Sequence, residues 1–150
     1  MKQITREAVR SFLPQRPANG HKGTFGRVLV VAGSRTMCGA GFLCAKSALL
    51  AGAGLVYWAL PQSMQPAFAA ALPEVITWPM PQTPQGEMAE EGFEFLQKQI
   101  EQVRPSVLVI GPGMGKSPLL EPLLWKTQLP LVIDADALNA LSKYQNRQDD

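Results

Sequence analysis

Residues 27–33 read RVLVVAG, in which Arg27 is followed by an unbroken apolar run rich in valine, and the stretch is bounded by Gly26 and Gly33. A run of this length and type predicts a strand buried on both faces, and such strands are typical of parallel sheets. Residues 39–53 (GAGFLCAKSALLAGA) are small or apolar almost all round, which predicts a helix that is itself largely covered. Residues 54–60 (GLVYWAL) predict a second strand. Two strands joined by a helix-length segment indicate a right-handed βαβ unit.

The same alternation extends over most of the chain. Further predicted elements are a helix over 4–13 with Thr5 as N-cap, a short helix over 62–72 broken at Pro66, an edge strand over 74–80 ended by Pro79, an amphipathic helix within 86–103, a strand over 106–110, a helix from Pro118, a strand over 130–133 and a last helix near 137–144. Strands that alternate with helices predict an α/β fold with a mostly parallel sheet.

Composition excludes several classes of partner. A chain of 150 residues can bury about 70% of its unfolded surface in one compact domain. The net charge of +2 is scattered, so we expect no nucleic-acid partner. The longest apolar run, residues 49–60, is shorter than the roughly 20 residues that cross a bilayer, and the N-terminus lacks the apolar stretch of a signal peptide. We therefore expect a cytoplasmic protein with no membrane contact. Cys38 and Cys44 lack CxxC spacing, so we expect reduced, packed thiols and no metal site.

The loop over residues 111–117, GPGMGKS, resembles two nucleotide-binding motifs but fits neither. A P-loop requires a glycine five residues before the glycine of GK, and that position is Ile110. Pro112 also removes one amide from any phosphate cradle. The dinucleotide fingerprint GxGxxG would need a glycine where the chain has Lys116. The sequence therefore argues against both motifs at this loop.

Two interpretations of this loop remain open. Gly113 and Gly115 would let backbone pass close to a ligand, while Ser117 and Pro118 suit the N-cap and the first helical position. A polar or anionic group of a ligand would fit beside this loop. Alternatively, the loop is only a tight connection between a strand and a helix.

Residues 134–139, DADALN, and the single histidine supply the other polar candidates. Asp134, at the tip of a predicted strand, could bind a metal or accept a hydrogen bond from a hydroxyl, or it could serve the structure alone. Asp136 is predicted to be the N-cap of the following helix. His21 has no partner in the sequence that would activate it, so we expect it to stabilise its own loop rather than to catalyse.

Four segments, in this order, resemble the N-terminal half of the ADP/ATP-dependent NAD(P)H-hydrate dehydratase family: HKGTFGRVLVVAGS, GAGFLCAKSALLAGAGLV, VLVIGPGMGK and LVIDADALNAL. The resemblance covers residues 5 to about 142. It implies a ribokinase-like, three-layer αβα fold with a mostly parallel sheet, here apparently truncated. It also implies that ADP or ATP phosphorylates the (6S) hydrate of NADH or NADPH (NADHX or NADPHX), and that loss of phosphate restores the reduced cofactor. The nucleotide could bring Mg²⁺ with it, and we expect a homo-oligomer when the protein is complete.

The resemblance also assigns residues to the substrate site. Ala40, in CGAG, matches the family position that lines the hydrate pocket, and Gly115 and then Gly113 match the loop that contacts the substrate. A helix N-terminus after Lys116 would favour the substrate's phosphates, with the lysine itself incidental. Residues expected to support the site without contacting substrate are Asp134, Asn139 and His21.

Two departures from the family pattern limit what these residues can do. Cys38 stands where the family often has tyrosine. The family's later signatures, a TPHxGE-like stretch, a KG segment and a GTGD-like loop with the catalytic aspartate, do not occur within residues 1–150. We therefore expect residues 1–150 to be the N-terminal part of a single domain, with the catalytic residue unknown and no activity alone. The alternatives are a ribokinase-like vitamin-precursor kinase and a non-catalytic dinucleotide-binding fragment.

Overall fold

The computed structural model describes residues 3–13 and 17–148 and contains one five-stranded sheet. The strands are β1 (Arg27–Val31), β2 (Leu55–Pro61), β3 (Ile76–Met80), β4 (Val107–Ile110) and β5 (Leu131–Ile133). Their order in the sheet is β3-β2-β1-β4-β5, and all four neighbouring pairs run parallel. The predicted α/β fold with a parallel sheet is therefore confirmed.

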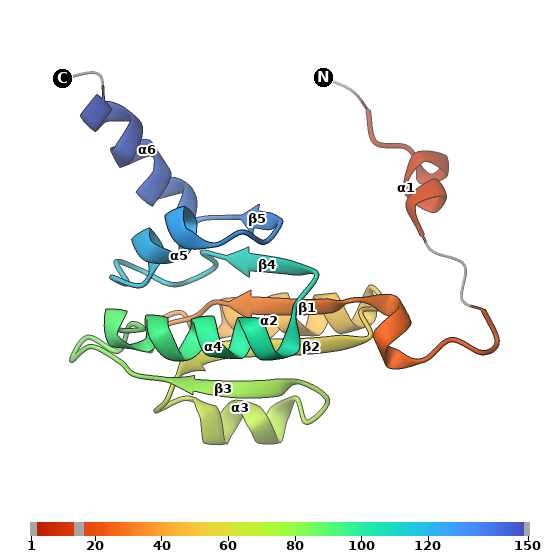
Figure 1. Ribbon diagram of the computed structural model, residues 1–150, viewed down its shortest axis with the longest axis horizontal. Coiled ribbons are helices and arrows are strands. Elements are labelled where there is room, and N and C mark those ends of the chain that lie inside the picture. Colours follow the sequence, from red (N-terminus) through yellow and green to blue (C-terminus); the bar gives the residue numbers. More distant parts are fainter. Residues whose placement is uncertain (1–2, 14–16, 149–150) are drawn as a thin grey trace.

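Helices cover both faces of this sheet (Figure 1). The helices of the described chain are α1 (Arg6–Phe12), α2 (Cys38–Leu50), α3 (Gln65–Ala71), α4 (Phe93–Val103), α5 (Leu120–Lys126) and α6 (Asp136–Gln148), with 3₁₀ turns η1 (Lys22–Phe25) and η2 (Glu90–Gly92). Of these, α1 stands apart from the sheet and covers neither face (Figure 1). Side chains of β1 alternate between the two faces: Leu29 and Val31 pack with α4 and α5, and Val30 packs with α2 and α3, as does Ala32 directly after the strand. The predicted three-layer arrangement is confirmed.

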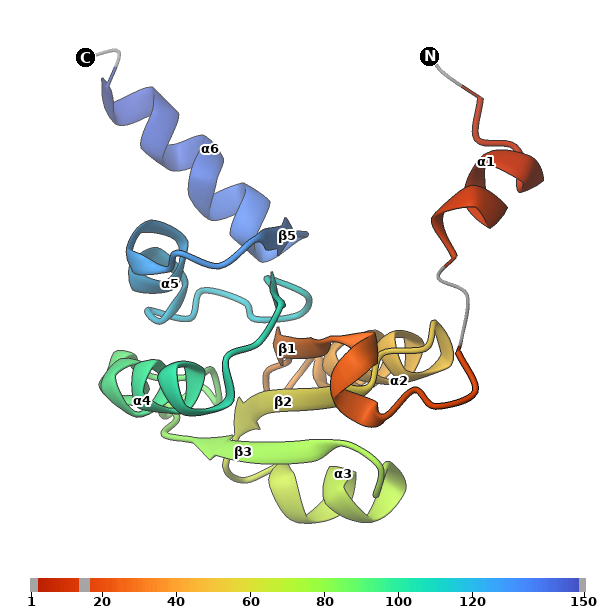
Figure 2. The same ribbon diagram turned by 45° about the vertical axis from the view of Figure 1, so that its right-hand side comes forward.

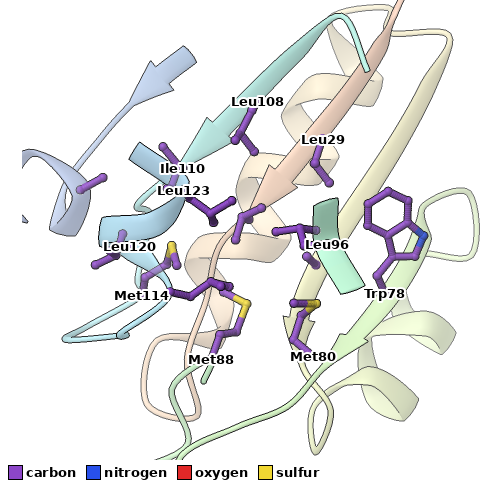
Figure 3. Close-up of a cluster of buried hydrophobic side chains, with 14 of the residues drawn as sticks. Leu29, Trp78, Met80, Met88, Leu96, Leu108, Ile110, Met114, Leu120 and Leu123 are labelled. Carbon is purple, nitrogen blue, oxygen red and sulfur yellow. The ribbon is translucent and has the colours of Figure 1, made fainter. Parts of the chain in front are cut away.

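The larger of the two cores lies between the sheet and the α4–α5 layer (Figure 3). Its labelled side chains come from β1, β3 and β4, from α4 and α5, and from the loops before these helices: Leu29, Trp78, Met80, Met88, Leu96, Leu108, Ile110, Met114, Leu120 and Leu123. Apolar residues of the loops thus join the core and hold the loops against the end of the sheet.

Helix α2 departs from its prediction. Its buried residues are Gly41 and Ala45, whereas Leu43 and Leu50 are 63% and 79% exposed. One face of α2 packs on β1 and β2, and no element of the described chain covers its outer face. The expectation of a largely covered helix is therefore wrong for this structure.

Two prolines also act differently from the prediction. Pro66 lies in the first turn of α3, where backbone N–H groups make no hydrogen bond within the helix. A proline therefore costs no hydrogen bond at this position, and the helix begins there instead of breaking. Pro79 lies inside β3, which continues to Met80. Within the described residues β3 is an edge strand, as predicted, so one of its sides has no hydrogen-bond ladder that a proline could interrupt.

Within residues 3–13 and 17–148, no helix combines the length and the apolar character needed to cross a membrane.

Candidate functional site

The loops that leave β1, β4 and β5 at their carboxyl ends are tied together by hydrogen bonds. The Gly33 amide donates to the Pro112 carbonyl at 2.8 Å, and the Asp134 amide donates to the Ile110 carbonyl at 3.1 Å. Ligands of open parallel sheets bind at this edge. The three loops therefore form one connected surface in the place where a ligand site is expected.

Ala40 and Gly113, two of the predicted substrate residues, lie in direct contact at this edge. A Cβ atom on Gly113 would lie 2.8 Å from Ala40 Cβ and 2.7 Å from the Met37 carbonyl oxygen. Gly113 also has a φ of 64°, in the left-handed region. Glycine is thus required here by packing and by backbone conformation, and it allows the loop after β4 to rest on the first turn of α2.

Two carboxylates hold the next part of the glycine loop. The Gly115 amide donates to Asp136 Oδ2 at 2.7 Å, and the Lys116 amide donates to Glu87 Oε1 at 2.8 Å. Asp136 is the first residue of α6, so its predicted role as N-cap is wrong: its carboxylate instead reaches across to the loop. These two bonds define a carboxylate clamp, Glu87 and Asp136, on consecutive amides.

The predicted helix start after Lys116 is also different in the structure. Helix α5 begins at Leu120 and has seven residues. Ser117 is buried, and its hydroxyl donates to the Met88 carbonyl at 2.6 Å and accepts from the Leu119 amide at 3.3 Å. Ser117 therefore links two loops ahead of the helix, and neither it nor Pro118 takes the predicted position at the helix start.

Asp134 and Asn139, two of the predicted supporting residues, flank this loop surface and are both exposed. Burial raises the pKa of the Cys44 thiol, and the negative charge of the Asp134 carboxylate raises it further. Asn139 lies on α6, where its carbonyl accepts from Ser142 Oγ at 3.0 Å.

His21 lies at the other end of the sheet, in the segment that enters β1. Its Nδ1 accepts from the Gly23 amide at 3.1 Å, and its own amide donates to Thr24 Oγ1 at 3.3 Å. These two bonds form a capping box around η1. His21 stabilises its loop, as expected, and is not brought to the edge that carries the other candidates.

An open cleft of about 720 Å³ lies between α5 and α6. Its walls include Gly115, Lys116, Asp136 and Asn139. The cleft is therefore next to the carboxylate clamp and gives a ligand access to one side of the glycine loop. Ala40 and Gly113 lie outside its walls.

The residues present do not fit the phosphates of a nucleotide. Pro112 has no N–H, and the amides of Gly115 and Lys116 already hold carboxylates, which would repel an added anion. Among the described residues, no group of three or more His, Cys, Asp or Glu side chains is arranged to hold a metal ion. We therefore assign no nucleotide or metal contact to this surface.

Sequence reasoning missed the segment between β3 and α4. The Arg35 amide donates to the Gly86 carbonyl at 2.9 Å, and Glu87 binds the Lys116 amide, so this segment contacts both the β1 and the β4 loops. Gly86 has a φ of 85°, and a Cβ there would overlap the Arg35 side chain. The only local signal was a glycine before an acidic residue in a proline-rich loop.

Comparisons with known proteins agree with this architecture. A family model described as NAD(P)H-hydrate dehydratase matches residues 28–150. A bifunctional NAD(P)H-hydrate repair enzyme Nnr of Moorella thermoacetica is 44% identical over 143 residues, which cover 93% of this chain and 27% of that protein.

Solved structures agree as well. A ribokinase-like superfamily protein of Enterococcus faecalis has a TM-score of 0.78 at 25% identity, covering 95% of this chain and 48% of the other. The ADP/ATP-dependent NAD(P)H-hydrate dehydratase of Bacillus subtilis, co-crystallised with ATP/Mg²⁺, has a TM-score of 0.68 at 27% identity, covering 89% and 46%. The chain thus spans about a quarter of the bifunctional relative and about half of each structural neighbour, and its fold is ribokinase-like. With a matching family model over most of its length, the chain belongs to the NAD(P)H-hydrate dehydratase family.

Proposed function

We propose that this chain supplies the substrate-binding edge for the dehydration of (6S)-NAD(P)H hydrate to NAD(P)H. In the overall reaction, ADP or ATP phosphorylates the hydroxyl of the hydrate. Loss of that phosphate together with a ring proton then restores the double bond. The residues on this surface would bind and orient the hydrate, and the nucleotide step is not assigned to them.

The contact between Ala40 and Gly113 is the observation that carries this proposal. It joins the two loops that the family resemblance assigns to the substrate, although the residues are far apart in the sequence. Because neither residue has a side chain beyond Cβ, a planar ring could lie against this part of the edge. Gly113 is buried beneath this contact, so we propose that Ala40 and Gly115 touch the hydrate and that Gly113 sets their separation.

Asp134 and Asn139 give this surface its polar character. Both are exposed beside the loops, so their oxygen atoms are available to hydrogen-bond hydroxyl or amide groups of a bound dinucleotide. We propose that residues 1–150 bind the hydrate without turning it over, since nothing on this surface fits the nucleotide. The alternative function, that of a ribokinase-like vitamin-precursor kinase, would be supported by the fold alone.

Calorimetry with (6S)-NADPH hydrate tests the proposal on this chain. Ala40→Leu enlarges the side chain that lies against Gly113, so it displaces the proposed contact surface and should weaken binding by about tenfold, which is about 1.4 kcal/mol. The matched control is Ala71→Leu, at the exposed end of α3, which should change the dissociation constant by less than about twofold.

Two results would contradict this assignment. Absence of saturable binding to the unmodified chain would remove the proposed function. Equal effects of the Ala40 and Ala71 variants would move the binding site elsewhere. A separate assay, recovery of NAD(P)H absorbance from the hydrate with ADP or ATP and Mg²⁺, should show no turnover by residues 1–150.

A further inference from the structure

The carboxylate clamp holds the peptide groups on both sides of Gly115. The Gly115 amide donates to Asp136 Oδ2 at 2.7 Å, and the Lys116 amide donates to Glu87 Oε1 at 2.8 Å. Hydrogen bonds to a charged acceptor are stronger than those to a neutral one. Figures 1 and 2 both show the loop after β4 lying between the first turn of α6 and the segment that leads to α4. The clamp therefore holds this loop from two sides.

Glu87 also packs directly against Gly115. A Cβ atom on Gly115 would overlap Glu87 Oε1, and the φ of Gly115, 67°, lies in the left-handed region. Glu87 is half-buried and belongs to a turn, in which the Thr83 amide donates to its carbonyl at 2.8 Å and its own amide donates to Thr83 Oγ1 at 3.3 Å. The fold thus places this carboxylate against the loop from a fixed backbone.

The position of Asp136 depends on a strained residue. Ala135, directly before it, has a φ of 45°, in the left-handed region that residues with a Cβ rarely adopt. The Asp134 amide donates to the Ile110 carbonyl at 3.1 Å, and the Asp134 carbonyl accepts from the Ala137 amide at 3.0 Å. Strain of this kind persists where the surrounding structure enforces it, and it clusters at functional sites. The hydrogen bonds around Ala135 therefore maintain the conformation that brings Asp136 to the loop.

The clamp also sets the direction of a carbonyl group in this loop. A trans peptide is planar, so its N–H and C=O point in opposite directions, and the described chain has no cis peptide bond. Because the Lys116 N–H points at Glu87, the Gly115 carbonyl of the same peptide points away from Glu87. A carbonyl oxygen accepts hydrogen bonds and does not donate them. With the Gly115 and Lys116 N–H groups engaged, the loop therefore offers a ligand an acceptor at Gly115.

We propose that Glu87 and Asp136 are positioning residues for substrate binding, which hold the Gly115 carbonyl in place to accept a hydrogen bond from an uncharged donor of the hydrate. The hydrate has two such donors, its ring hydroxyl and its carboxamide. An anionic group would be repelled at this point by both carboxylates. The inference rests on the function proposed above, since it requires the hydrate to bind beside Gly115.

Calorimetry with (6S)-NADPH hydrate tests the role of the clamp. Glu87→Ala removes the acceptor of the Lys116 amide and should raise the dissociation constant at least about tenfold, and Asp136→Ala should act in the same direction through Gly115. Glu87→Gln keeps a side-chain oxygen that can accept this bond and should stay within about threefold of the unmodified chain.

Two controls separate lost positioning from other effects of these changes. Glu91→Ala removes the same charge from an exposed position in the same segment, and it should change the dissociation constant by less than about twofold. Urea unfolding of each variant shows whether it is fully folded under the conditions of the binding experiment, so that a loss of stability is not mistaken for a loss of positioning.

NMR on the unmodified chain tests the direction of the hydrogen bond without a substitution. Saturating hydrate should move the Gly115 carbonyl-carbon signal downfield, as accepting a hydrogen bond does, while the Gly115 and Lys116 amide protons should keep the downfield positions that their carboxylate acceptors give them. NADPH has the carboxamide but lacks the ring hydroxyl. A carbonyl shift with both ligands would identify the carboxamide as the donor, and a shift with the hydrate alone would identify the hydroxyl.

Three results would overturn this inference. The first is a folded Glu87→Ala chain that binds the hydrate as tightly as the unmodified chain. The second is an equal loss of binding in Glu91→Ala, and the third is a Gly115 carbonyl signal that saturating hydrate does not move. In each of these cases the unmodified chain still binds the hydrate, so the proposed function stands. No binding by the unmodified chain would remove both proposals.

Discussion

Replacement of Gly113 by alanine tests whether packing, rather than a ligand, requires glycine in the loop after β4. At a φ of 64°, a residue with a Cβ loses about 1 kcal/mol relative to glycine. The new Cβ would also lie 2.7 Å from the Met37 carbonyl oxygen and 2.8 Å from Ala40 Cβ, and overpacking of this kind costs about 1–3 kcal/mol. We therefore expect the free energy of unfolding to fall by about 2–4 kcal/mol.

Urea unfolding of the ligand-free chain, followed by tryptophan fluorescence at low concentration, measures this loss. Gly39→Ala is the matched control, because Gly39 lies in the first turn of α2 and a Cβ there meets no atom within 4 Å. The control should be neutral or more stable by up to about 1 kcal/mol. A Gly113→Ala chain within about 0.5 kcal/mol of the unmodified protein would refute the packing argument.

Two further predictions concern the loops around this contact. Glu87→Ala should speed hydrogen exchange at the Lys116 amide by up to about tenfold, because that N–H loses its carboxylate acceptor. Glu74→Ala, at the other end of the sheet, should leave the exchange rate of this amide unchanged. Equal exchange rates in the two variants would contradict the clamp. Asp134→Asn should speed alkylation of Cys44 at pH 8, measured in a Cys38→Ser background. Removing the negative charge lowers the raised pKa of the Cys44 thiol and so increases the fraction of reactive thiolate. An unchanged alkylation rate would show that burial alone raises that pKa.

The order of elements could be predicted because each strand has a local signal. After Arg27, strand β1 is a continuous apolar run, and in the structure both of its faces carry helices. The exposure of α2 could not be predicted in this way. Composition shows that Leu43 and Leu50 are apolar, but whether another layer covers them depends on what else packs there.

The location of the site in the fold could be predicted from the sequence, but the hydrogen bonds that build it could not. Parallel strands direct their loops to one edge, so Ala40 and Gly113 could be expected near each other. The partner of each loop amide could not be expected, because Glu87 and Asp136 act on residues 29 and 21 positions away. Asp136 has the features of a helix cap, and its long-range bond overrides that local preference.

The central position of β1 has a consequence for synthesis on the ribosome. One side of β1 pairs with β2, which follows within a few tens of residues, but the other side pairs with β4, whose first residue is Val107. At translation rates of roughly 5–20 residues per second, the β4 side of this valine-rich strand stays unpaired for roughly 4–15 seconds after β1 has been made. During that interval the growing chain carries an open sheet edge, so a chaperone that binds exposed strands would have a binding surface there until residues 107–110 close it.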